Sequence, residues 1–129
     1  MAKQLKVNTT VMSGTAISTD SLNSSLTATI TVDNPIVQAA EITLNYGTPT
    51  AQEIIATGKT MSTYCYVKNM DTANYISVRT KSTNVEFIRL KAGEHAFFPV
   101  APSIGCELIN SAAATSNTMV IYGTFDAKE

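Results

Sequence analysis

The sequence contains no tryptophan and a single histidine, and most kinds of catalytic site need side chains that it lacks. A zinc site needs three or four closely spaced ligands, whereas Cys65 and Cys106 stand far apart in the chain and His95 is alone. His95 begins a candidate strand, where a solvated or hydrogen-bonded histidine is commoner than a general base. No glycine-rich phosphate loop, nucleophile elbow or dinucleotide motif occurs in the sequence. We therefore expect a protein that is not an enzyme and holds neither a metal nor a cofactor.

Long hydrophobic runs are also missing. No apolar stretch approaches the roughly 18 residues of a membrane-spanning helix, so we expect no membrane partner. Residues 1–6 lack the apolar core of a secretion signal, which predicts synthesis in the cytoplasm. Thiols stay reduced there, and both cysteines lie in apolar, strand-like runs. Cys65 and Cys106 are therefore expected to be small, buried hydrophobic residues.

Charge is sparse and unevenly distributed. Charged residues make up 15% of the chain, against about 25% in an average domain, and a net charge of −1 argues against a nucleic-acid partner. Residues 7–58 contain four acids and no base, whereas residues 59–91 contain six bases and two acids. These charges either scatter over separate strands or form complementary patches that meet where subunits or partners dock.

The polar residues are mostly neutral, since threonine, serine and asparagine supply 39 of the 129 residues. Threonine suits strands, while asparagine and serine favour turns. Apolar and polar residues alternate with a period of two in several runs, and turn residues recur about every ten positions. The segment 50–58 could be a short helix or a strand, and we favour a strand or an irregular segment. The other candidate strands are 25–32, 41–46, 60–67, 75–80, 85–90, 95–100, 106–110 and 118–125.

This pattern predicts an all-β protein, an antiparallel β-sandwich or jelly-roll-like barrel of about 8–10 short strands with little or no helix. We expect residues 1–24 to form a partly extended N-terminal strand and arm, with a long loop over 9–24, and residues 25–129 to form one β-sandwich domain. Both chain ends are expected to be loosely held. Proline at positions 99 and 102 limits ladder pairing, so we expect the strand 95–100 to end early or to lie at a sheet edge. Alternation predicts that Ile30, Val78 and Ile121 are buried.

Two segments resemble small structural proteins of tailed-phage virions: residues 66–78 (YVKNMDTANYISV) and residues 87–100 (FIRLKAGEHAFFPV). In such proteins a strand that ends in an Asn-x-Asp turn leads to a partner strand, and an Arg-Leu-Lys-x-Gly-Glu hairpin returns an apolar strand to the sheet. The resemblance covers residues 60–125, about half the chain. It implies a virion protein with a sandwich or jelly-roll-like fold, assembled in the host cytoplasm, and it brings no catalytic residues.

The resulting expectation is a capsid decoration or cement protein that stabilises the head by bridging capsid subunits. Its partners would be the major capsid protein or other virion proteins and further copies of itself, with a trimer favoured. The alternatives are a head–tail connector, neck or tail protein and, from another class, a carbohydrate- or receptor-binding β-sandwich module that uses the tyrosines. The residues expected to form the docking interface lie in the N-terminal arm and the basic strands: Thr9, Thr10, Met12, Thr15, Ile17, Lys59, Lys68, Arg79, Lys81 and Arg89.

Overall fold

A computed structural model describes residues 3–12, 23–32 and 38–128, and these residues form ten β-strands and no helix. The all-β prediction is therefore confirmed. Within these ranges there is no helix long and apolar enough to cross a membrane. The strands are β1 (Lys3–Met12), β2 (Asn23–Val32), β3 (Gln38–Leu44), β4 (Gln52–Ile55), β5 (Thr63–Asn69), β6 (Ile76–Arg79), β7 (Glu86–Leu90), β8 (His95–Val100), β9 (Cys106–Asn110) and β10 (Thr118–Asp126).

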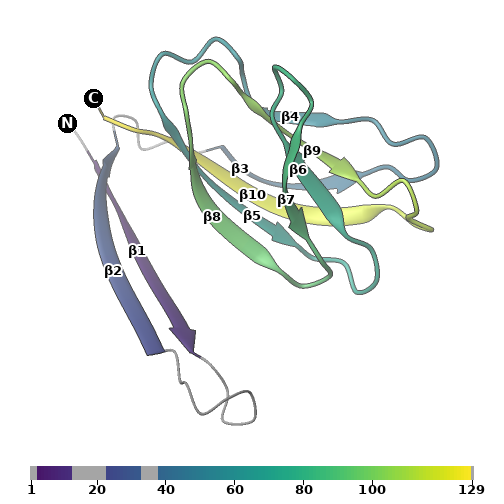
Figure 1. The fold of residues 1–129 in the computed structure, drawn as a ribbon, viewed down its shortest axis with the longest axis horizontal. Coiled ribbons are helices and arrows are strands. Elements are labelled where there is room, and N and C mark those ends of the chain that lie inside the picture. Colours follow the sequence, from purple (N-terminus) through teal and green to yellow (C-terminus); the bar gives the residue numbers. More distant parts are fainter. Residues whose placement is uncertain (1–2, 13–22, 33–37, 129) are drawn as a thin grey trace.

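Eight of the strands form a sandwich of two four-stranded antiparallel sheets (Figure 1). We call the sheet with strand order β3-β10-β5-β8 sheet I and the sheet with order β4-β9-β6-β7 sheet II. Along the chain the pairs β3–β10, β4–β9, β5–β8 and β6–β7 are nested one inside the next. Strands β3 to β10 thus form one long hairpin that is folded over on itself. The pairs β10–β5 and β6–β9 complete the two sheets of the sandwich. This is the strand order of a jelly roll.

Alternate residues of the two sheets fill the space between them. In β5, for example, Cys65 and Val67 point inward and are fully buried, while Tyr64 and Tyr66, which alternate with them, are only partly buried. The predicted burial of Val78 is confirmed, since it is fully buried in β6. The core comprises Leu44, Ile54, Ile55, Cys65, Val67, Ile76, Val78, Leu90, Val100, Cys106, Leu108, Val120 and Tyr122.

The expected burial of Ile30 and Ile121 is wrong. In β10 the side chains of Thr118, Val120 and Tyr122 are buried on the inner face, so Ile121 lies on the outer face of sheet I and is half-exposed. Ile30 belongs to β2, which is not part of the sandwich, and it is half-exposed as well. Period-two alternation separates the two faces of a strand but does not say which face is covered when both carry apolar residues.

Two connections that were expected to join neighbouring strands cross between the sheets instead. The turn after Asn69 leads from β5 in sheet I to β6 in sheet II, and Lys91 to Glu94 lead from β7 back to β8. The second is a tight turn in which the Glu94 N–H donates to the Lys91 carbonyl and Gly93 has φ +81°. Packed sheets lie only about 10 Å apart, so a short turn together with the residues that flank it can lead to the facing sheet as well as to a neighbouring strand.

Other local predictions hold. The segment 50–58 contains strand β4 (Gln52–Ile55), as favoured. Strand β8 lies at the edge of sheet I, where Pro99 pairs with Tyr64. The turn expected after β5 is built by Asp71, whose Oδ2 accepts hydrogen bonds from the Ala73 and Asn74 N–H groups.

Buried asparagines close the end of the sandwich where the loops after β3, β5, β7 and β9 meet. The Asn110 amide donates to the Leu44 and Ser116 carbonyls, and its Oδ1 accepts from the buried Thr118 hydroxyl. The Asn69 amide donates to the Asn74 and Leu90 carbonyls in the same way. Among the described residues, no buried polar side-chain atom is left without a partner. Side-chain amides therefore tie together loops that are distant in sequence.

Strands β1 and β2 form a separate hairpin that leaves the sandwich and projects past it (Figure 1). Its ten cross-strand pairs run from Lys3–Val32 to Met12–Asn23. The structure differs from the expectation in two ways. Thr9 to Met12 belong to a strand rather than to a loop, and β2 begins before the expected boundary at residue 25 and pairs with β1 rather than with the sandwich. Residues 13–22 lie outside the described residues.

The base of the hairpin is fastened to the end of β10. Val32 is buried and forms an isolated bridge with Ala127, and the Lys128 N–H donates to the Thr31 carbonyl. The Ala127 N–H in turn donates to the Ser62 carbonyl. The loose C-terminal end expected from the sequence is thus held by backbone hydrogen bonds at Ala127 and Lys128.

Candidate functional site

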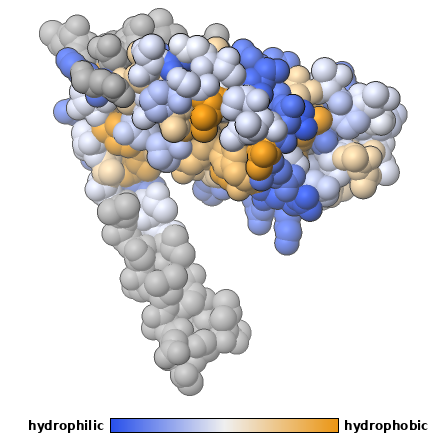
Figure 2. All heavy atoms as spheres, turned by 45° about the horizontal axis from the view of Figure 1, so that its top comes forward, coloured by the Kyte–Doolittle hydropathy of each residue, from blue (hydrophilic) through white to orange (hydrophobic). Residues whose placement is uncertain are grey.

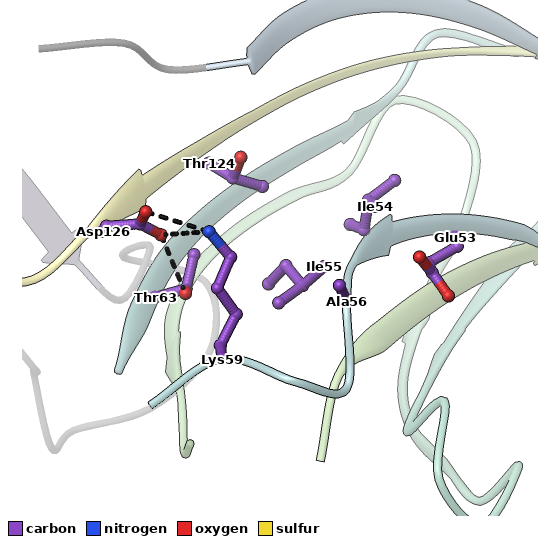
Figure 3. A pocket seen from close by; sticks show the side chains of 8 residues that line it. All are labelled: Glu53, Ile54, Ile55, Ala56, Lys59, Thr63, Thr124 and Asp126. Atoms are coloured by element: carbon purple, nitrogen blue, oxygen red, sulfur yellow. Dashed lines mark hydrogen bonds and ion pairs between the residues drawn. The ribbon is translucent and has the colours of Figure 1, made fainter. Parts of the chain in front are cut away.

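One recess lies between β4 of sheet II and β10 of sheet I, and both polar and apolar side chains line it (Figure 3). It has a volume of ≈ 350 Å³. Lys59 reaches across it to Asp126, with Nζ 3.1 Å from Oδ1 and 2.9 Å from Oδ2, and the Thr63 hydroxyl donates to Oδ1 at 3.3 Å. The lining residues are Glu53, Ile54, Ile55, Ala56, Lys59, Thr63, Thr124 and Asp126.

The contacts in this recess are those of a structural ion pair. The charges of Lys59 and Asp126 already satisfy one another, and both side chains are partly exposed. Glu53 stands apart from this pair on β4 (Figure 3). The described residues contain no group of three or more His, Cys, Asp or Glu side chains that could hold a metal ion. The Lys59–Asp126 pair therefore joins the β4–β5 loop to β10.

A second recess, which we call the hairpin groove, separates β1 from the outer face of sheet I. It has a volume of ≈ 410 Å³ and is open to solvent. The hairpin contributes Leu5, Lys6, Val7, Asn8 and Thr9, and sheet I contributes Tyr66, His95, Phe97, Ile121, Tyr122, Gly123 and Phe125. Figure 2 shows hydrophobic residues gathered over the part of the sandwich nearest the hairpin, with strongly hydrophilic residues further along the body.

The floor of the groove is aromatic. The Tyr64 and Phe97 rings are stacked with centroids 5.9 Å apart, and the Tyr66 and His95 rings lie 6.1 Å apart. The pairing register places Gly123, Tyr66 and Phe97 in one row across three strands, and Phe125, Tyr64 and Pro99 in the next row. Neither row carries a charge.

Charges border these rows on one side. The row next to Gly123 contains Ile121 with Glu41 on one neighbouring strand and Lys68 on the other. The outer face of sheet I thus has an uncharged aromatic centre and a charged border. Protein interfaces have this distribution, with charge depleted and aromatic residues enriched at the centre.

The hairpin is amphipathic. Leu5 and Val7 pair with Ile30 and Ala28 on one face, and all four are half-exposed. The other face carries exposed polar residues: Gln4, Lys6, Asn8, Thr27, Thr29 and Thr31. A two-stranded hairpin is marginally stable in water unless its apolar face packs against something. The projecting hairpin therefore has apolar surface that the described chain covers only in part.

The basic residues expected to form a docking surface do not gather in one place. Lys68 lies on the outer face of sheet I, and the others lie in sheet II or at its end and are paired with carboxylates of the same chain. The pairs are Lys59–Asp126, Arg79–Glu107, Lys81–Glu107 and Arg89–Glu86. The basic residues therefore lie on separate strands, which is the first of the two interpretations of the charge distribution, and four of the five are paired within the chain.

Glu107 holds two of these bases on the outer face of sheet II. Its side chain is 1% exposed, its Oε1 accepts from Arg79 Nε, and its Oε2 lies 3.5 Å from Lys81 Nζ. On the same sheet Arg89 lies 4.3 Å above the centre of the Tyr75 ring. These intrachain contacts neutralise the basic side chains, so their charge contributes little to binding a partner.

Of the hairpin residues in the expected interface, Thr9 and Thr10 are exposed in β1, and Thr9 lines the groove. Met12 is the last residue of β1, and Thr15 and Ile17 lie outside the described residues. Sequence reasoning considered Tyr66 only among the tyrosines of the alternative binding module, and it did not select Phe97 and Phe125 of the aromatic floor. The alternation of Tyr64 and Tyr66 with two buried residues was the signal that could have indicated an aromatic outer face.

Cys65 of sheet I and Cys106 of sheet II face each other across the core. Both are fully buried and neither forms a disulfide, which agrees with the expected role of small hydrophobic residues. A hydrogen bond with the Cys106 side chain raises the pKa of the Cys65 thiol well above its usual range, and burial raises it further. Cys65 therefore keeps its proton in the folded chain under conditions where an exposed thiol loses it.

This pKa shift predicts that stability falls at alkaline pH. The unfolded chain releases the Cys65 proton above about pH 8.5, whereas the folded chain retains it, so stability is complete below that pH and is lost as pH rises. The free energy of unfolding should fall by about 1 kcal/mol between pH 7.5 and pH 9.5. Urea titrations at a series of pH values measure this slope. A Cys65→Ala variant should show a flatter slope, and identical slopes for the two proteins would contradict the prediction.

No family model matches the chain, and no curated protein sequence matches it either.

Proposed function

We propose that this protein is a non-enzymatic structural subunit of a tailed-phage particle, of the kind that decorates or cements the capsid. The observation that carries the proposal is a jelly-roll body with an amphipathic hairpin that projects beside an uncharged aromatic face. Double-sheet jelly rolls are common in viral structural proteins and in lectins. The resemblance of residues 66–78 and 87–100 to small virion proteins selects the first of these classes.

The hairpin and the aromatic face suit contact with other proteins. The cross-strand rows that contain Tyr66 and Tyr64 have no charged residue. A partner that covers this face therefore does not have to remove water from an ion. The proposed partners are the major capsid protein or other virion proteins and further copies of the same chain. In this function the protein bridges capsid subunits and stabilises the head, and its place of action is the virion.

Electron cryo-microscopy of purified particles from the virus that encodes this chain tests the proposal. We expect density for the jelly roll at regular positions on the head, in hundreds of copies, and heads that lack the protein should open at lower temperature. Six or twelve copies in a ring would indicate a head–tail connector, neck or tail protein instead. Particles without this chain would contradict every virion role.

A second candidate is a carbohydrate- or receptor-binding module, because Tyr66, His95 and Phe97 form an aromatic wall in an open groove of ≈ 410 Å³. Ligand pockets commonly have volumes of about 300–1,000 Å³, and sugar rings stack on aromatic side chains. A glycan array probed with the purified chain decides this candidate. Binding that a Tyr66→Ala substitution abolishes would support it, and an array without signal would remove it.

A further inference from the structure

The groove is lined by the edge of β1 rather than by one of its faces. Side chains at successive positions of a strand point to opposite faces, yet five consecutive residues, Leu5 to Thr9, line the groove. Within the described residues β1 pairs with β2 on one side, and no strand pairs with it on the other. The backbone N–H and C=O groups of that second edge therefore face the groove.

An open strand edge beside an apolar floor is suited to binding a further strand. Main-chain hydrogen bonds to the edge provide affinity, and side chains of the added strand rest on the floor. Here the floor contains Tyr66, Phe97 and Phe125, which lie on the outer face of sheet I. Proteins normally pair, cover or blunt such an edge, because it otherwise recruits other chains.

We propose that the occupant of the hairpin groove is β1 of a second copy of this chain, paired antiparallel with β1 of the first. The two hairpins then form one four-stranded sheet, β2-β1-β1-β2, and each hairpin covers the aromatic floor of the other copy. An antiparallel pair of identical strands has two-fold symmetry, so one contact closes both free edges. A trimer was the state favoured by the sequence, whereas this edge supports a two-fold pair.

The sequence of β1 fits this pairing when Val7 lies on the two-fold axis. Lys6 then stands opposite Asn8 of the other copy, and Leu5 stands opposite Thr9. No lysine of β1 faces another lysine, because the partner of Lys3 in this register is Val11. The apolar face that begins with Leu5, Val7, Ala28 and Ile30 continues without a break from one hairpin into the next.

Charge substitutions at Asn8 test the register. Asn8 and Lys6 are both exposed and lie on the polar face of the hairpin. We expect wild type to be a dimer in sedimentation velocity. Asn8→Lys should raise the dimer Kd by about two- to thirty-fold, because it sets lysine against lysine twice, and Asn8→Glu should lower it by a similar factor.

Thr27→Lys is the matched control, since Thr27 pairs with Asn8 within the hairpin but lies on β2, away from the paired edge. It should change the dimer Kd far less than Asn8→Lys does. A wild-type chain that is monomeric at tens of micromolar, or equal dimer Kd values for Asn8→Lys and Asn8→Glu, would overturn the proposal.

Cross-linking tests the position of the two-fold axis. In the proposed register the two Val7 Cβ atoms lie about 4.5–5.5 Å apart, so a Val7→Cys variant should form a disulfide-linked dimer with oxidised glutathione. The reaction converts two thiols and one oxidised glutathione into one disulfide and two reduced glutathiones. Gln4→Cys is the control, because two Gln4 residues would lie about 20 Å apart. A covalent dimer of Gln4→Cys without one of Val7→Cys would overturn the register.

This inference does not depend on the place of the protein in a virion, because both tests use the purified chain in solution. A chain that dimerises through β1 but is missing from the particles would contradict the proposed function alone. A chain that is present in particles but monomeric in solution, with Asn8→Lys and Asn8→Glu incorporated equally well, would contradict the inference alone.

Discussion

A Val78→Asp variant is expected to be unfolded under conditions in which the wild-type chain is folded. Val78 is fully buried in β6, where it pairs with Ile88 on one side and Leu108 on the other. The core cluster around Val78 contains no charged residue, so a carboxylate at this position has no cation to pair with. Burying it costs several kcal/mol, against a total stability of about 5–15 kcal/mol for a domain. Circular dichroism and urea titration measure the loss.

Ile121→Asp is the matched control for Val78→Asp. Ile121 is also an apolar strand residue, but it lies on the outer face of sheet I and is half-exposed. The new carboxylate stays in contact with water, so we expect a folded protein that is less stable by about 1 kcal/mol. Unfolding of both variants, or of neither, would contradict the assignment of the faces of the sandwich.

An Asn110→Ala variant should be destabilised by about 3 kcal/mol. The Asn110 side chain donates to the Leu44 and Ser116 carbonyls and accepts from the Thr118 hydroxyl. Its removal deprives the fully buried Thr118 hydroxyl of its acceptor, and an unpaired buried polar group costs about 1–3 kcal/mol. The Leu44 carbonyl loses a donor at the same time. Urea titration of the folded variant gives the difference in free energy.

Asn117→Ala is the control for Asn110→Ala. Asn117 lies in the same group of loops and accepts one hydrogen bond, from the Tyr46 N–H, but it is exposed. Water can replace it as the partner of that N–H, so we expect a loss below about 1 kcal/mol. If Asn117→Ala cost as much as Asn110→Ala, burial would not be what makes the asparagine network stabilising.

The positions of the strands could be predicted from the sequence more closely than the faces that they bury. The limits of β8 and β9 agree with prediction because turn residues stand directly outside them, such as Gly93 and Glu94 before β8 and Gly105 before β9. In β10, by contrast, Val120 and Tyr122 alternate with Ile121 and Phe125, so both faces are apolar and the pattern has no preferred side.

The pairing of the strands and the candidate interface could not be predicted for related reasons. The turn from Lys91 to Glu94 looks like a hairpin turn, but its length is equally suited to crossing between sheets, and only the packing of the whole sandwich decides. The groove combines residues from β1, β5, β8 and β10. No local sequence pattern indicates that Val7 and Phe97 line the same groove. The ion pairs of the basic residues could not be predicted either, because their carboxylate partners, such as Glu107 for Arg79, come from other strands.

The nested pairing of the strands has a consequence for the order of events during synthesis. Strand β10 is a central strand of sheet I and pairs with both β3 and β5, so sheet I is incomplete until residues 118–126 have left the ribosome. Strand β3 is made about 80 residues earlier and has no partner in the sandwich until then. Contacts between residues so distant in sequence slow folding. The growing chain therefore carries an unpaired amphipathic strand while about 80 further residues are made, and the jelly roll forms only when β10 is inserted.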